Sequence, residues 1–161
     1  MKNKFFCLAL VSFLFLFSSC SAEYCDNVSS AKIASAISEN IENSEFSEYP
    51  DVHYYLIFGD DERNYDDATI IYSDDINDIS EFGIFHSKDK KAAQEVFKDV
   101  CEYIDDFKET QRGFIMSYAP GETKKLDGAW VKMYGNYVIY GICSTEERSL
   151  SENSIKNLIG N

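Results

Sequence analysis

The most regular pattern of apolar and polar positions covers residues 89–110. Apolar side chains recur there at helical spacing and form one stripe, whereas acidic residues and lysines fill the opposite side. This pattern predicts a long amphipathic helix, and Gly113 marks its end or the start of the following loop. The apolar stripe consists of Ala93, Val96, Phe97, Val100, Ile104 and Phe107.

Two segments with shorter apolar patterns precede this helix. Apolar residues at helical spacing predict a helix over residues 31–43, with Ser29 or Ser30 as its N-cap. Residues 53–58 are apolar and aromatic. Their pattern fits either a strand or a last helical turn stopped by Gly59, because periodicity does not separate the two in so short a run.

A hairpin and a final helix complete the elements around the long helix. β-branched and aromatic residues predict strands over residues 68–73 and 79–86, which a turn rich in Asp and Asn joins as a hairpin. A last helix is expected near residues 151–159 with Ser151 as its N-cap, although a capping box that begins two residues earlier competes with this start.

A second hairpin is predicted by two apolar runs around Tyr134-Gly135-Asn136-Tyr137, where glycine stands at the first central position of a type II′ turn. In this register Tyr134 faces Tyr137, Met133 faces Val138 and Val131 faces Tyr140. Side chains alternate along a strand, so one face is expected to lie on the core. That face holds Ala129, Val131, Met133, Val138, Tyr140 and Ile142, and the other holds Trp130, Lys132, Tyr134, Tyr137, Ile139 and Cys143.

The element order predicts an α+β fold, with helices packed on one face of a small, mostly antiparallel sheet of about four strands. Residues 29–161 are long enough for a single domain with a real core, and residues 20–28 are interpreted as a tether. We find no internal repeat and no low-complexity linker, which favours a single domain.

The first twenty residues predict an export signal. Lys2 and Lys4 precede an apolar run over residues 5–17, which is shorter than the roughly 20 residues that span a bilayer. Phe17-Ser18-Ser19-Cys20 resembles a bacterial lipobox, so we expect residues 1–19 to be removed and Cys20 to carry lipid. The lipid would hold the protein on the outer face of the cytoplasmic membrane. The alternative is cleavage after Ala22, which would release a secreted chain.

Charge and cysteine content limit the partners. Loss of residues 1–19 removes two lysines and no acid, which takes the formal charge from −13 to about −15. Such a field excludes nucleic acid as a partner and favours a basic protein or peptide. Cys25, Cys101 and Cys143 lack the close spacing of a metal or redox motif, so packed thiols are expected.

The sequence contains no catalytic or metal-binding motif. Its two histidines, His53 and His86, have no paired spacing for zinc, and the acidic turn at residues 74–78 lacks the spacing of a calcium loop. We therefore expect no cofactor and favour a non-catalytic binding or interaction module. The alternative is an envelope hydrolase whose Ser, His or acid constellation is assembled only in space.

The candidate binding residues are Trp130, Tyr134 and Tyr137, on the hairpin face turned away from the predicted core. Exposed aromatic patches are typical of interaction sites. The alternative, which we favour, is that the first helix or residues 46–58 cover this face. The accessibility of Trp130 separates the two interpretations.

Several segments together resemble an uncharacterised bacterial family, the domain of unknown function 4358, which occurs mostly in lipoproteins of Gram-positive bacteria. The resemblance covers about residues 66–144 and implies fold and location, but no activity. It also favours a helix closed by Gly59 over residues 52–58. The segments are Asp78-Ile79-Ser80-Glu81-Phe82-Gly83-Ile84-Phe85, the helix start at Lys88-Asp89, Tyr118 with Pro120, and Gly135-Asn136-Tyr137-Val138.

Overall fold

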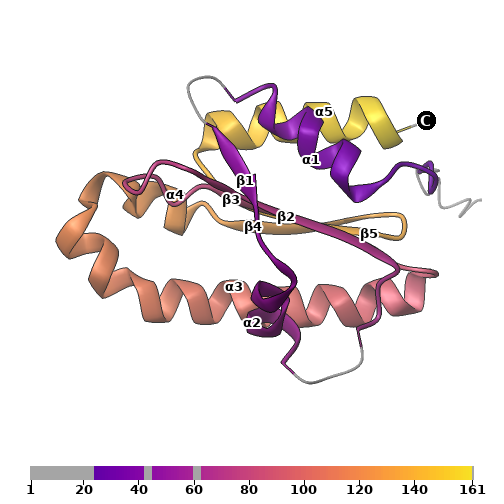
Figure 1. Cartoon of the computed structure of the whole chain (residues 1–161), viewed down its shortest axis with the longest axis horizontal. Coiled ribbons are helices and arrows are strands. Elements are labelled where there is room, and N and C mark those ends of the chain that lie inside the picture. Colours follow the sequence, from indigo (N-terminus) through magenta and orange to yellow (C-terminus); the bar gives the residue numbers. More distant parts are fainter. Residues whose placement is uncertain (1–23, 42–44, 60–62, 161) are drawn as a thin grey trace, which may run out of the picture.

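Three layers make up the part of the chain that the computed structural model describes, residues 24–41, 45–59 and 63–160. A sheet lies in the middle, with α1 (Ser30–Ser38) and α5 (Thr145–Ile159) on one side. The helices α2 (Tyr55–Phe58) and α3 (Lys90–Tyr118) lie on the other side (Figure 1). The predicted leader, Cys20 and the alternative cleavage site after Ala22 lie outside the described residues.

The sheet is antiparallel throughout, and in the described ranges it has five strands in the order β1-β2-β3-β5-β4. The predicted α+β class is therefore confirmed, with five strands where about four were expected. The additional strand, β1, is a three-residue edge strand, too short to show a periodic pattern. The strands are β1 (Phe46–Glu48), β2 (Asp67–Ser73), β3 (Glu81–His86), β4 (Trp130–Tyr134) and β5 (Tyr137–Ile142).

Both predicted hairpins form. Strands β2 and β3 pair directly, and the register of β4 with β5 is the expected one, with Tyr134 opposite Tyr137 and Val131 opposite Tyr140. Gly135 adopts a φ of 61°, which a side chain would disfavour and which a primed turn requires.

The N-terminal helical segments agree with the sequence in type but not always in length. Ser29 is the N-cap of α1, which ends before the expected residue 43. Residues 52–58 are helical, first as the 3₁₀ helix η1 (Asp51–Tyr54) and then as α2, and Gly59 closes them with a φ of 56°. The helical interpretation of this segment is thus confirmed.

The later helices are longer than expected. Helix α3 continues past Gly113 to Tyr118, because the ~1 kcal/mol cost of a helical glycine is offset when the next turn buries Ile115. It is followed by η2 (Pro120–Glu122) and α4 (Thr123–Asp127). Helix α5 begins well before Ser151, because Ser144 and Glu147 form a complete capping box.

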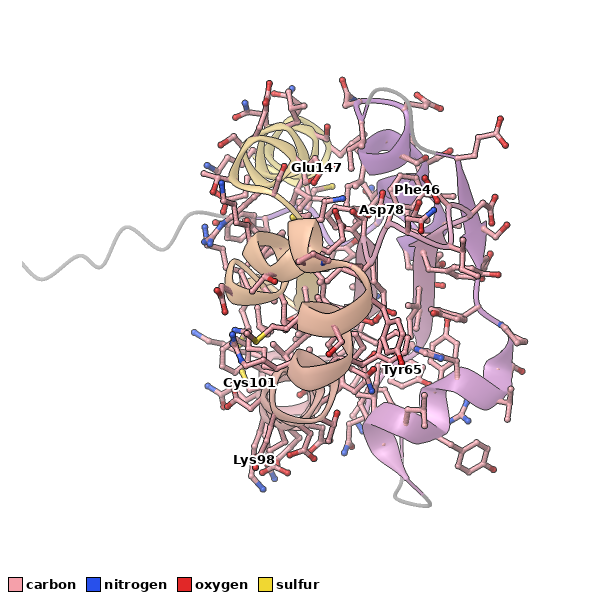
Figure 2. All side chains as sticks on the ribbon, turned by 90° about the vertical axis from the view of Figure 1, so that its left-hand side faces the viewer. Phe46, Tyr65, Asp78, Lys98, Cys101 and Glu147 are labelled. Atoms are coloured by element: carbon pink, nitrogen blue, oxygen red, sulfur yellow. The ribbon has the colours of Figure 1, made fainter. Side chains whose placement is uncertain are left out.

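The helices cover both faces of the sheet, which corrects the expectation of one covered face. Apolar residues of α1 and α5 pack with one face in one core cluster, and those of η1, α2 and α3 pack with the other face in a second cluster. The burial of strand β5 agrees with two covered faces, since all six of its residues are buried, as is typical of a strand between two layers. Figure 2 shows the same layers from the side, with Lys98 of α3 pointing away from the sheet.

Candidate functional site

The aromatic residues singled out by the sequence are not on the surface. Trp130, Tyr134 and Tyr137 are only 5%, 4% and 0% exposed, and they pack in the cluster formed with α1 and α5. The Tyr137 hydroxyl donates a hydrogen bond to the Val28 carbonyl oxygen at 2.7 Å. These residues therefore do not form the exposed aromatic patch, and the interpretation that we favoured, a covered face, is the one observed. The covered arrangement holds, with α1 as one cover and α5 as the other.

The acidic turn and the cysteines, which were also noted in the sequence, have the following contacts. In the acidic turn between β2 and β3, the Asp75 carboxylate accepts hydrogen bonds from the backbone and side chain of Asn77. Asp78 pairs with Lys125 at 2.5 Å. Of the cysteines that the structure describes, Cys25, Cys101 and Cys143 are all free thiols.

A buried carboxyl group marks a different site, on the opposite side of the sheet. Glu81 begins β3 and is 5% exposed. Because side chains alternate, it shares its face of the strand with Phe85, which belongs to the cluster under α2 and α3. An acid therefore occupies a position where this face is otherwise apolar.

Tyrosines from two elements hold one oxygen of Glu81. The Tyr103 hydroxyl on α3 donates to Oε1 at 2.9 Å, and the Tyr140 hydroxyl on β5 donates to the same atom at 2.5 Å. His53 of η1 approaches the other oxygen, with 4.0 Å between its Nε2 and Oε2. Its Nε2 is buried without a hydrogen-bond partner among the described residues.

Tyr49 completes the group, which we call the Glu81 cluster: Tyr49, His53, Glu81, Tyr103 and Tyr140. The Tyr49 ring stacks on His53 with 3.6 Å between ring centroids, and on Tyr72 at 4.1 Å. Tyr49 also hydrogen bonds to the Glu81 carboxyl group. The segment between β1 and α2 thus brings an aromatic wall and an imidazole onto the carboxyl group.

The Glu81 cluster lies at a pocket of about 280 Å³. Its wall on α3 is a single helical face, because positions 103, 106, 107, 110 and 111 have helical spacing. Leu56 of α2, with 66% of its surface exposed, lies at the pocket's edge. Figure 2 shows α2 and α3 flanking this side of the sheet, with Tyr65 pointing between them.

A second, larger hollow of about 600 Å³ lies where α1 ends and α5 begins. Its lining includes Glu147, whose side chain is already used in the α5 capping box, and Leu150. The described residues place no buried acid or histidine there. The smaller pocket is therefore the stronger candidate, because it joins a concave surface to convergent buried polar groups.

Burial controls the protonation of the Glu81 cluster. It raises the pKa of Glu81, against the opposing effect of hydrogen bonds from Tyr140, Tyr103 and Tyr49. It lowers the pKa of His53, and burial together with the charge of Glu81 raises the pKa of Tyr49 to about 12. Burial thus shifts the pKa of the acid upward and the pKa of the imidazole downward, and shifted pKa values are common in binding and catalytic sites.

The close packing of Tyr140 depends on Gly83, two residues after Glu81. A Cβ at Gly83 would lie 2.1 Å from Cε1 of Tyr140, so Gly83→Ala forces the phenol ring away from Glu81. We expect the free energy of unfolding to fall by about 1–3 kcal/mol, as for other overpacked cores. Urea unfolding measures this change.

A matched control is Gly113→Ala in α3, where nothing lies within 4 Å of the added Cβ. This change should stabilise the protein by about 0.5–1 kcal/mol, because alanine favours the helix. If Gly83→Ala left the free energy of unfolding unchanged, the Tyr140 ring would have to move aside at no cost, which would contradict its close packing.

The described part of the chain is thus an α+β protein with helices on both sides of an antiparallel sheet and a buried acid under a pocket. The chain belongs to the family described as Domain of unknown function (DUF4358), whose match spans residues 35–143. All five residues of the Glu81 cluster lie inside this span, whereas Cys20 and α5 lie outside it. No curated protein and no solved structure matches the chain.

Two further observations concern the described residues alone. None of their helices has the length and apolar character needed to cross a membrane. None of their His, Cys, Asp and Glu side chains gather in groups of three or more that could hold a metal ion.

Sequence reasoning did not find the Glu81 cluster. His53 was noted only as an isolated histidine, and Glu81 only as part of a strand. A usable signal was present, because Glu81, Gly83 and Phe85 alternate with Phe82 and Ile84 in a strand that is apolar on both faces. Its partners come from three other parts of the chain, the segment around η1, α3 and β5, so spacing alone does not connect them.

Proposed function

We propose that this protein is an exported, lipid-anchored module of the cell envelope that binds a small ligand in the pocket at Glu81 without transforming it. The observation that carries the binding role is the Glu81 carboxyl group, which is buried beneath α2 and α3 and lines a pocket. Removal of a charged carboxyl group from water carries a desolvation cost that its hydrogen bonds must offset. Recognition of a ligand is a reason to keep an acid there.

The anchoring part of the proposal depends on the leader and on Cys20. Only three residues lie between Cys20 and Tyr24, where the described chain begins, and the four steps from one to the other span at most ~14 Å. Tyr24 packs with the cluster under α1 and α5, and the Cys25 amide donates to the Ile159 carbonyl oxygen at 2.9 Å. A lipid at Cys20 would therefore keep the α1–α5 side near the membrane and leave the pocket on the far side of the sheet.

The charge of the chain supports a cationic partner. A formal charge of −13 for the whole chain, and about −15 after loss of the leader, repels nucleic acid and attracts a basic protein or peptide. Such a partner would be additional to the ligand in the pocket.

One observation favours the second candidate, an envelope hydrolase. Glu81 and His53 are two proton-transfer groups with shifted pKa values, and their nearest atoms are 4.0 Å apart. The described lining of the pocket contains no serine, cysteine or lysine, and the hydroxyl of its threonine, Thr110, donates to the Asp106 carbonyl oxygen instead of to a base. Recovery of a bound ligand in unchanged chemical form favours the binding module, and its conversion favours the hydrolase.

Filling the pocket tests the binding role. The Leu56→Trp change places a large side chain at the pocket edge from an exposed position, so the fold should remain intact. We expect it to weaken the binding of small fragments, measured by ligand-observed NMR, by about tenfold or more.

The matched control is Leu150→Trp, at an equivalent position in the larger hollow, which is 38% exposed. It should leave fragment binding unchanged. Equal effects of the two substitutions, or fragment binding that survives Leu56→Trp, would remove the pocket at Glu81 as the ligand site.

A further inference from the structure

We infer that the ligand of this pocket is a small organic cation, with an ammonium group that lies at Glu81 and an apolar body that lies against α3. This inference rests on the proposed function, because it names the chemical class of the ligand for the same pocket. It is carried by the charges, the aromatic rings and the hydrogen-bonding capacity of the pocket.

The charged residues of the pocket are of one sign. Glu81 and Asp106 both line it, and no lysine or arginine is present in its described lining. An anionic ligand would meet two acids without a basic partner, whereas a cation would be attracted by both. The net negative charge of the whole chain adds to this preference.

The Glu81 carboxyl group has capacity for another donor. An oxygen of a carboxylate accepts about two hydrogen bonds, and the hydroxyls of Tyr103 and Tyr140 already fill this capacity at Oε1. The whole carboxyl group has about four acceptor positions, and the hydroxyls of Tyr103, Tyr140 and Tyr49 take three of them, so room remains for at least one further donor. An ammonium group brings three donors and a compensating charge.

His53 offers a second acceptor next to that position. In its neutral form with the proton on Nδ1, Nε2 is an acceptor, and it is buried without a partner among the described residues. Since Nε2 and Oε2 are 4.0 Å apart, a single nitrogen placed to one side of the line between them reaches both at hydrogen-bond distance. This arrangement suits a primary ammonium group.

The remaining wall suits a small apolar body. Tyr103 and Phe107 are one helical turn apart on α3, and Leu56 closes the opposite edge. Aromatic rings also attract cations. A volume of about 280 Å³ lies at the lower end of the range for small-molecule sites. The pocket therefore limits the ligand to about the size of one ring that carries a short chain.

Three probes of one size test the charge of the ligand: 2-phenylethylammonium, the uncharged 2-phenylethanol and the anionic phenylacetate. Their affinities for the mature protein are measured by titration calorimetry at about pH 8, where the amine keeps its charge. We expect the ammonium compound to bind about tenfold or more tightly than the other two, because only this compound carries a compensating charge and donors.

Variants of the pocket identify the residues that cause the preference for the ammonium compound. Glu81→Gln keeps the size of the side chain but removes its charge, and it should reduce the preference to about twofold or less. Asp106→Asn, at an exposed position, should reduce the preference without a risk to folding. The control Glu109→Gln removes the same charge from an exposed site on α3 outside the pocket and should change nothing.

The inference is overturned if the alcohol or phenylacetate binds as tightly as the ammonium compound, or if none of the three binds. It is also overturned if Glu81→Gln and Asp106→Asn both keep the full preference. If fragments still bind and Leu56→Trp still abolishes their binding, the pocket remains the ligand site and only the class of ligand is wrong. If Leu56→Trp has no effect on any ligand, the proposed function itself fails.

Discussion

Replacement of Glu81 by alanine is expected to lower the free energy of unfolding by about 3 kcal/mol or more, because it leaves the hydroxyls of Tyr103 and Tyr140 without their acceptor. It also opens a cavity beneath the pocket. Glu81→Gln should cost much less, because the amide keeps an acceptor oxygen and nearly the same volume. Urea unfolding of the wild type and both variants measures the difference. Equal losses in the two variants would contradict the role of the carboxyl group as acceptor.

The pH dependence of stability follows from the same group. Burial raises the pKa of Glu81 in the folded protein above the ordinary value of 4.5, so the folded state holds this proton more tightly than the unfolded state. The resulting stabilisation is complete below the unfolded pKa and is lost as the pH rises through the folded pKa. Glu81→Gln should lack this loss.

His53 acts in the opposite direction and must be separated from Glu81. Its pKa is lowered by burial, so its contribution to stability is present above its ordinary value of 6.5 and is lost as the pH falls through the folded pKa. The difference in unfolding free energy between wild type and Glu81→Gln cancels the part due to His53. A difference that stays constant from below 4.5 to neutral pH would show that the pKa of Glu81 is not raised.

The Cys20→Ser change is expected to move the protein from the membrane fraction to the soluble exported fraction. A serine at this position cannot form the thioether that carries the lipid. Each buried CH₂ contributes ~0.8 kcal/mol to membrane binding, so two acyl chains hold a protein stably and their loss releases it. Cell fractionation with detection of the protein in each fraction measures this change.

Mass spectrometry of the mature N-terminus is the control for Cys20→Ser. We expect the wild type to begin at Cys20 and to carry the added mass of acyl chains. A wild-type chain that begins at Glu23, after cleavage behind Ala22, would replace the lipid-anchored account with the secreted one.

Local chemistry explains which parts of the fold the sequence could predict. The register of the second hairpin follows from one two-residue turn, because Gly135 at positive φ fixes which residues of β4 and β5 stand opposite each other. Helix boundaries were harder to predict. Gly113 did not end α3, because burial of Ile115 outweighs a weak local preference.

The layers and the site depend on tertiary contacts. The face of β4 and β5 that carries Trp130 was weighed both as an exposed patch and as a covered surface, and the cover is provided by α1 and α5. The Glu81 cluster joins residues from the segment around η1 and from β3, α3 and β5. No spacing rule connects these segments, so the site could be found only once the sheet order had placed them together.

The central claim is that the pocket at Glu81 is the ligand site of an envelope module. Native mass spectrometry of the protein purified from its own envelope, as wild type and as Leu56→Trp, tests this claim most directly. We predict that the wild type retains a small molecule that the variant lacks, while Leu150→Trp retains it. The same bound mass in all three proteins, or an empty wild type that also fails to bind any fragment, would contradict it.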